Sequence, residues 1–252
     1  MSVADTFRID TTEHKPIGST LLVGQANPGM AGVTAVDHLV RHLDATLIGH
    51  VAPNDLPAIA PFEDGVPRHH GRLFTHTGAD MTILIEELFV PVGAGRGYVD
   101  ALLDWIEPSA VDEITVLHGV PFPHGPEEHD VFSVATPAYR DRRLADSSLS
   151  PLRGGLLDGI VGELVTRSLD ETVPETGVLI TPTHLPGPDI DAALRLIDAL
   201  EGLYDLDVDE TDLRTFGDQL KQYYEQLASR MESRGAGGSD VSSEYPDDRM
   251  FM

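Results

Sequence analysis

Thr20-Leu-Leu-Val-Gly24 is a short apolar run that stops at a glycine, and Pro28-Gly-Met-Ala-Gly-Val-Thr-Ala-Val-Asp-His-Leu-Val-Arg-His-Leu43 follows it after three residues. The first run predicts a buried strand. In the second stretch apolar side chains recur at helical spacing, at Val33, Val36, Leu39, Val40 and Leu43. Asn27 before Pro28 predicts an N-cap with proline at the first helical position. Residues 45–51 predict the next strand, so the chain opens with a β-α-β unit.

The rest of the chain continues this alternation. Residues 72–77 and 81–86 predict two strands joined by a turn, and the second strand is apolar on both faces, which is typical of the middle of a sheet. Further strands are predicted at 113–118, 131–135 and 177–181, and helices at 98–106, 155–169, 190–200 and 213–231. This order predicts a three-layer α/β/α sandwich with a mostly parallel central sheet and an amphipathic C-terminal helix.

The last twenty residues differ from the rest in composition. Residues 233–249 carry almost no apolar side chains and cannot offset the entropy lost on ordering, which predicts a disordered tail over 233–252 behind a single domain over 1–232. The tail ends in Met250, Phe251 and Met252, which place apolar and aromatic side chains beside a terminal carboxylate. Such an end can be captured in a pocket of another protein, or it can simply fray.

The charge of the chain limits its partners. With 42 acidic and 17 basic residues the formal charge is −25, which excludes nucleic acid as a default partner and disfavours an anionic membrane surface. Only Lys15 and Lys221 are lysines, and this acidic, lysine-poor composition resembles proteins of organisms that hold molar salt, where the Debye length falls to about 3 Å. There is no cysteine, no leader pattern and no membrane-length apolar run, so we expect a cytoplasmic protein.

The turn that contains Gly24, Asn27, Gly29 and Gly32 is a candidate ligand or oligomer loop, because it leads into a helix N-terminus where free N–H groups favour an anion. It does not follow the GxGxxG pattern, and it lacks the Lys-Ser/Thr pair of a phosphate loop. Glycines at such a turn also allow a helix to pack closely on a sheet. The sequence favours this packing role over a phosphate ligand.

Other candidate sites have a simpler structural explanation. His118, His124 and His129, with Glu127, Glu128 and Asp130 nearby, could bind zinc, but their spacing matches no metalloprotease helix, so we expect loop histidines and no metal. His69, His70 and His76 form no such pattern either. Arg140, Arg142 and Arg143 could hold an anion, yet in so acidic a chain we expect local salt bridges. No GxSxG elbow and no distinctive acid/base pair occurs, so no catalytic residue and no cofactor is assigned.

Several motifs in order resemble the archaeal proteasome-assembly chaperone family. The opening Leu-Leu-Val-Gly24-Gln-Ala-Asn-Pro-Gly29-Met-Ala-Gly32, followed by Ala35-Val-Asp-His-Leu-Val40, is similar to the start of that family. Gly154-Gly155-Leu-Leu-Asp-Gly159-Ile, the strand Val178-Leu-Ile-Thr181 and the proline-rich loop to Asp189 resemble its second half. The similarity covers roughly residues 17–206, and the composition points to a haloarchaeal member.

The resemblance implies a non-catalytic, homo-oligomeric protein that assists assembly of α-type proteasome subunits or docks on the finished particle. Docking members use a C-terminal tripeptide of hydrophobic residue, tyrosine and any residue, to which Met250, Phe251 and Met252 correspond with phenylalanine in place of tyrosine. Loss of the phenolic hydrogen bond is worth about 1 kcal/mol net. The alternative is a nucleotide- or small-ligand-binding enzyme, sometimes labelled ATP-grasp-like, that uses the Gly24–Gly32 turn.

Overall fold

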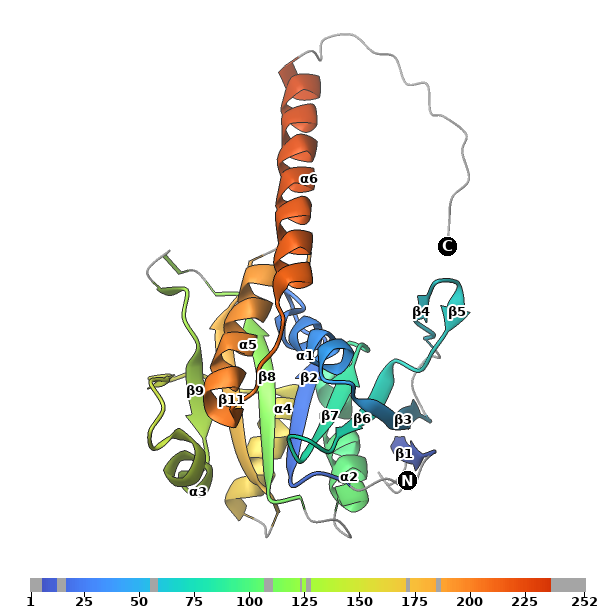
Figure 1. The fold of residues 1–252 in the computed structure, drawn as a ribbon, viewed down its shortest axis with the longest axis vertical. Helices are drawn as coiled ribbons and strands as arrows, with labels where there is room; N and C mark the ends of the chain where they lie inside the picture. Colours follow the sequence, from blue (N-terminus) through green and yellow to red (C-terminus); the bar gives the residue numbers. More distant parts are fainter. Residues whose placement is uncertain are drawn as a thin grey trace.

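A nine-stranded sheet forms the centre of the computed structural model, which describes residues 6–12, 17–54, 59–106, 111–122, 124–125, 128–170, 173–184 and 187–236 (Figure 1). The strands lie in the order β1-β3-β6-β7-β2-β8-β11-β9-β10. Their bounds are β1 Phe7–Thr11, β2 Thr20–Gln25, β3 Thr46–Pro53, β6 Gly71–His76, β7 Met81–Glu86, β8 Glu113–Val120, β9 Phe132–Ala135, β10 Ser150–Pro151 and β11 Glu175–Pro182. Every residue of β2 and β7 is buried, as their apolar sequences predict.

The sheet is mixed, and the predicted mostly parallel sheet is wrong. The four strands β7, β2, β8 and β11 are parallel neighbours, but β1–β3, β3–β6, β6–β7 and β11–β9 are antiparallel. Residues 77–80 are too short for a crossover, so β6 and β7 form a hairpin. Strands β3, β6 and β7 follow one another without an intervening α-helix, and the alternation of strands and helices holds only around the parallel centre.

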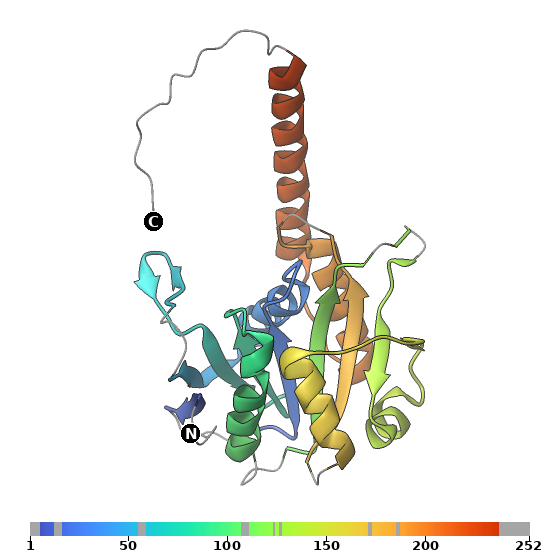
Figure 2. The same cartoon turned by 180° about the vertical axis from the view of Figure 1, so that it is seen from behind.

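Helices cover both faces of the sheet, as expected for an α/β/α arrangement (Figures 1 and 2). On one face α1 (Ala31–His42) and α5 (Ile190–Tyr204) pack in a core that includes Leu22, Leu117 and Leu179. On the other face α2 (Gly95–Ile106) and α4 (Gly159–Asp170) pack in a second core that includes Val23 and Val116. The alternation of side chains along β2 and β8 therefore supplies both cores.

Helix α1 begins later than its sequence predicts. Its first residue is Ala31, and the preceding residue, Met30, lies in the left-handed region at φ 53 with no side-chain cap. Asn27 and Pro28 belong instead to the turn after β2, where the N–H of Met30 donates to the carbonyl of Asn27 at 2.9 Å. The backbone has positive φ at Gly29 and Met30, so a right-handed helix cannot begin at Pro28 and starts only at Ala31.

Several small elements carry no strong sequence signal. The edge strand β1 and the hairpin of β4 (Phe62–Glu63) and β5 (Val66–Pro67) lie on one side of the fold. A 3-10 turn over Val92–Ala94 precedes α2, and the short helix α3 (Pro137–Tyr139) continues as a π-helical turn over Arg140–Leu144. Among the described residues no helix has both the length and the apolar character needed to cross a bilayer.

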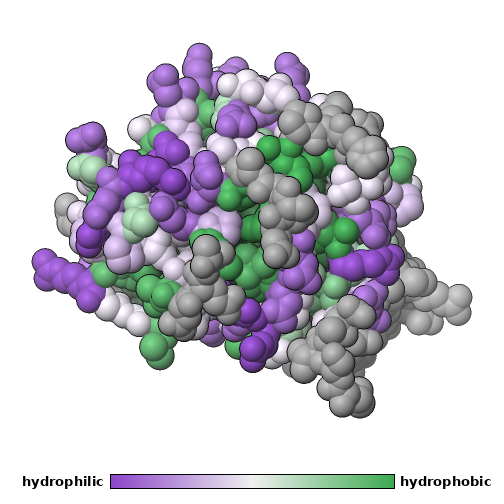
Figure 3. All heavy atoms as spheres, turned by 90° about the horizontal axis from the view of Figure 1, so that it is seen from below, coloured by the Kyte–Doolittle hydropathy of each residue, from purple (hydrophilic) through white to green (hydrophobic). Residues whose placement is uncertain are grey.

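Figure 3 views the molecule from the end opposite α6 (Thr211–Ala236). Hydrophilic residues are spread around the rim of this face, and hydrophobic residues gather toward its centre. Helix α6 is the longest helix, and it projects from the body of the fold in both ribbon views (Figures 1 and 2). The predicted C-terminal helix is thus confirmed, but it continues to Ala236, so residues 233–236 are helical where the sequence predicts the start of a disordered tail. The rest of that predicted tail, residues 237–252, lies outside the described residues.

Candidate functional site

Helix α6 is the most distinctive surface of the molecule because most of its length projects from the body of the fold. A helix of 26 residues is about 39 Å long, and from Lys221 to Met231 every residue except Tyr224 is exposed. Helices of globular proteins gain most of their stability by packing an apolar face. A long helix without such packing therefore points to a contact outside this chain.

The base of α6 is held by contacts with the loop before α5. Leu213 is buried, and a Cβ at Gly217 would lie 3.0 Å from Ile190, so the helix and α5 approach closely there. Two turns further on, the hydroxyl of Tyr224 lies against the backbone of Gly187. These contacts fix the direction in which α6 leaves the body.

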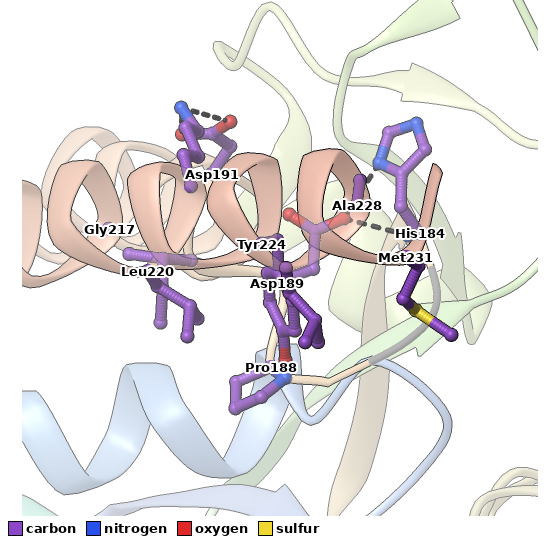
Figure 4. A pocket seen from close by; sticks show the side chains of 12 residues that line it. His184, Pro188, Asp189, Asp191, Gly217, Leu220, Tyr224, Ala228 and Met231 are labelled. Carbon is purple, nitrogen blue, oxygen red and sulfur yellow. Dashed lines mark hydrogen bonds and ion pairs between the residues drawn. The ribbon is translucent and has the colours of Figure 1, made fainter. Parts of the chain in front are cut away.

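A groove of about 530 Å³ runs between α6 and a second wall formed by His184 and by residues 188–191 at the start of α5 (Figure 4). His184 and Met231 lie at one end of this groove, and Gly217 and Leu220 lie toward the other. Its walls are mainly apolar, with Pro188, Leu227 and Ala228 among the lining residues. The groove continues the apolar surface of the helix onto the body of the protein.

Polar contacts of Asp189 and Asp191 order this side of the groove. Asp189 caps α5 by accepting from the N–H of Ala192 at 2.9 Å, and it also accepts from the N–H of His184 at 2.7 Å. Desolvation opposes ionisation of Asp189, but these backbone hydrogen bonds and that of the His184 ring outweigh it and lower the pKa of the carboxyl. Lys221 pairs with Asp191 at 2.8 Å across the groove, and this hydrogen bond raises the pKa of the lysine.

The apolar side chains of α6 form one stripe. At 100° per residue they fall within an arc of about 100°. The stripe consists of Phe216, Leu220, Tyr223, Tyr224, Leu227 and Met231. The sequence predicts that this face is buried, yet Phe216 is 50% exposed, Tyr223 59% and Met231 67%. The amphipathic helix is confirmed, but the described chain leaves much of the face open.

Gly24 and Gly32 lie at the contact between α1 and the sheet. A Cβ at Gly24 would lie 2.3 Å from Val36 Cγ2, and one at Gly32 would lie 2.2 Å from the carbonyl oxygen of Leu117. Gly29 adopts φ +84 beside Thr183. Each of the three predicted glycines therefore has a packing or backbone role, and the turn as a ligand or oligomer loop stays a prediction.

A second cavity of about 320 Å³ adjoins this turn where β2 and β8 end. Asn27 donates its side-chain N–H to His118 Nδ1 at 3.2 Å, and both residues line the cavity with Phe89, Leu156 and Asp158. No lysine or arginine is among its lining residues. Desolvation lowers the pKa of His118 to about 4, so its imidazole is neutral at pH 7. The cavity thus offers a phosphate group no cation from its lining.

The arginines after β9 form local salt bridges, as the sequence predicts. Glu113 is buried at 2% exposure, and its carboxylate accepts from Arg143 at 2.6 Å and from Arg142 at 3.1 Å. Arg140 pairs with Asp141 on the surface at 2.8 Å. The buried acid of β8 explains why two cations stand together in so acidic a chain.

The structure divides the predicted histidine group. His118 contacts Asn27, whereas His124 and His129 meet His184, which the sequence-based prediction omitted. His69 stacks on His50, and His70 Nδ1 lies 2.7 Å from the buried Glu86 carboxylate. Met250, Phe251 and Met252 lie outside the described residues.

Comparison with known proteins gives a family match over most of the chain. The PAC2 family model matches residues 21–228. No curated protein matches. Among solved structures, Pyrococcus furiosus PbaA, an archaeal homolog of proteasome-assembly chaperone, has a TM-score of 0.78 at 18% identity, over 91% of this chain and 95% of that chain.

Two other solved structures are similar to this chain in fold. Pyrococcus furiosus PbaB, an archaeal proteasome activator, has a TM-score of 0.77 at 18% identity, over 89% of this chain and 99% of that chain. A Thermoplasma acidophilum protein of unknown function has a TM-score of 0.71 at 24% identity, over 88% and 92% of the two chains.

Proposed function

Because this chain belongs to the PAC2 family, we propose that it is a non-catalytic proteasome assembly chaperone or docking factor that binds α-type proteasome subunits. The observation that carries the proposal is the family match over residues 21–228, which includes most of α6. Similarity in fold to an archaeal proteasome-assembly chaperone homolog and to an archaeal proteasome activator supports it. Residues 1–236 would form the assembling body and residues 237–252 a flexible tether.

In this proposal Met250 and Phe251 enter a cleft between neighbouring α-subunits, and the carboxylate of Met252 pairs with a cation there. Full burial of two large apolar side chains contributes about 3 to 6 kcal/mol. Ordering of the tail and loss of rotational freedom offset much of this gain. A single tail is therefore a weak binder, and efficient docking needs several tails.

Self-association through α6 would supply those tails. The exposed stripe of α6 offers an apolar face for the same helix of a second copy, and residues 216, 220, 223 and 227 alternate in steps of four and three, the spacing of a coiled-coil seam. A tether of about thirteen residues, 237–249, spans roughly 18 to 22 Å. Tails of one oligomer could then reach neighbouring pockets and gain avidity.

The acidic composition supports a place for this protein in the cytoplasm of a salt-accumulating archaeon. A formal charge of −25 with two lysines creates strong self-repulsion at low ionic strength. Molar salt screens that repulsion. Unfolding at several potassium chloride concentrations checks this part of the proposal: we expect stability to rise up to molar salt, and a stability that does not change with salt would contradict it.

Binding of α-subunits from the same organism tests the proposed function. We expect the intact chain to recover α-subunits in a pulldown in high salt, and a chain without residues 250–252 to recover far less. Phe251→Ala should abolish most binding, whereas Phe251→Tyr should strengthen it by about 1 kcal/mol, roughly fivefold. Equal recovery by the intact and shortened chains, or recovery by neither, would rule out tail docking.

A further inference from the structure

Three histidine side chains meet at the edge of the sheet where β8 and β11 end. His124 and His129 lie between β8 and β9, and His184 follows β11. Because β8 and β11 are parallel and β9 is antiparallel to β11, these connections meet at one edge. The ring centroids lie 4.8 to 5.0 Å apart, and one nitrogen from each ring lies within 4.8 Å of the others.

Two of the rings are each oriented by a hydrogen bond at Nδ1. His184 Nδ1 lies 2.9 Å from the Asp189 carboxylate, and His124 Nδ1 lies 2.6 Å from the carbonyl oxygen of Phe122. Both acceptors lack hydrogens, so each Nδ1 carries the proton and each Nε2 has a free lone pair. A carboxylate or backbone carbonyl in this position is the usual support of a metal-binding histidine.

An unsatisfied nitrogen also points to a ligand. His124 Nε2 is buried and has no hydrogen-bond partner within the described part of the chain. A buried polar atom without a partner costs free energy that a bound ligand would recover. The side chains of His129 and His184 are exposed, so their rings can rotate toward His124.

The charges around the cluster are compatible with a cation. The Asp189 side chain is only 7% exposed, and its carboxylate stands directly behind the His184 ring. Arg195 is the nearby cation, but its guanidinium donates to Thr181 Oγ1 at 2.9 Å and to the carbonyl of Pro182 at 2.8 Å. Arg195 is thus held by the end of β11, and the Asp189 carboxylate supports the imidazole of His184.

We propose that His124, His129 and His184 form a binding site for a divalent transition metal of the zinc class. Imidazole ligands select zinc, nickel, cobalt or copper over magnesium and calcium. Tetrahedral zinc with bonds of about 2.0 to 2.1 Å needs ligand nitrogens about 3.4 Å apart, so the rings close by a modest rotation. Three protein ligands leave the fourth position to water.

Metal binding here would connect two loops that meet beside α6. The β8–β9 connection supplies two ligands, and the loop that seats α6 supplies the third. His184 lines the α6 groove, and Asp189 both supports His184 and caps α5. The metal therefore stabilises the seat of α6, and this role does not depend on proteasome binding.

Titration of the chelator-treated full chain with zinc chloride in high salt tests the site. We expect one site per chain with a micromolar or tighter Kd, a Tm raised by about 5 °C or more at saturation, and visible absorption typical of low-coordinate Co²⁺ when cobalt replaces zinc. His129→Gln and His184→Gln should each weaken binding by about 100-fold or more. His76→Gln, which removes a histidine outside the cluster, should bind zinc as the unchanged chain does.

Asp189→Asn tests the carboxylate behind His184. The one side-chain oxygen of asparagine can still cap α5, but the NH₂ group would replace the oxygen that accepts from His184, so zinc binding should weaken by about 10- to 100-fold, and the Tm of the metal-free variant measures any loss of stability separately. An unchanged chain that binds no zinc at micromolar concentration would overturn the proposal. Full zinc affinity in both His129→Gln and His184→Gln would overturn it equally.

Discussion

The hydroxyl of Tyr224 lies so close to Gly187 that a Cβ on the glycine would come within 2.2 Å of that oxygen. Gly187 also has φ +92, a backbone conformation that other residues rarely adopt. One contact thus joins the middle of α6 to the loop before α5. It requires glycine for two independent reasons.

Gly187→Ala should therefore displace Tyr224 and destabilise the protein. Positive φ and the lost contact together cost about 1 to 3 kcal/mol in the free energy of unfolding, which denaturant titration measures. Gly202→Ala is the matched control, because Gly202 lies within α5 and a Cβ there meets nothing within 4 Å. The control should gain about 0.5 to 1 kcal/mol, and an equal loss in both variants would contradict the argument.

Removal of the Glu113 charge should destabilise the start of β8, where this carboxylate holds the arginines that follow α3. Loss of one partner from a buried ion pair costs about 3 to 5 kcal/mol, and we expect about 3 for Glu113→Gln because Arg142 and Arg143 stay 43% and 28% exposed. Asp141→Asn removes the exposed pair with Arg140 and should change stability by less than about 0.5 kcal/mol. Similar losses in both variants, measured by denaturant titration, would count against the burial argument.

Gly24→Ala and Gly32→Ala should both loosen the contact of α1 with the sheet. Their Cβ atoms would lie 2.3 Å from Val36 and 2.2 Å from the Leu117 carbonyl, and overpacking of this kind costs about 1 to 3 kcal/mol. Gly154→Ala is the control, because its Cβ meets nothing within 4 Å. Thermal unfolding compares the three variants. Unchanged Tm values for Gly24→Ala and Gly32→Ala would show that close packing does not require glycine at these two positions.

The sequence predicts the features of this structure that depend on neighbouring residues. It does not predict those that depend on residues far apart in the chain. Helices α5 and α6 and strands β2 and β7 follow from local periodicity and are confirmed. The sheet order is not local, and the hairpin of β6 and β7 makes it mixed. The start of α1 was also missed, because the Asn27-Pro28 signal competes with a turn that requires positive φ at Gly29 and Met30.

The side-chain clusters illustrate the same limit. Glu113 and Arg143 stand 30 residues apart, and the sequence predicts salt bridges for the arginines without identifying this partner. His184 joins His124 only because β8 and β11 end at the same edge. One signal in the sequence pointed to His184: it stands five residues before Asp189, the N-cap of α5. A histidine that contacts a helix cap is held in a defined orientation.

Burial of His118 should make stability fall with acidity. Its pKa in the folded protein is about 4, below the ordinary 6.5, so the unfolded chain binds more protons between these values. Stability is therefore lost as the pH falls from 6.5 toward 4, by about 3 kcal/mol in total. Denaturant titrations across this range measure it. His118→Asn keeps an acceptor for the Asn27 side chain but has no group that titrates in this range. A difference in unfolding free energy between the two proteins that does not change with pH would contradict the prediction.

The exposed stripe of α6 should make self-association dependent on both apolar contact and salt. Leu227 belongs to the apolar stripe of α6 and is 40% exposed. Leu227→Asp places a charge where a second copy would pack. We expect light scattering to show an oligomer in about 1 M potassium chloride and a monomer for this variant, with weaker association at low salt because each copy carries a formal charge of −25. Gln222→Asp adds the same charge on the polar side of α6 and should leave the oligomer intact. A monomer at every salt concentration, or equal oligomers in both variants, would show that α6 does not join the copies.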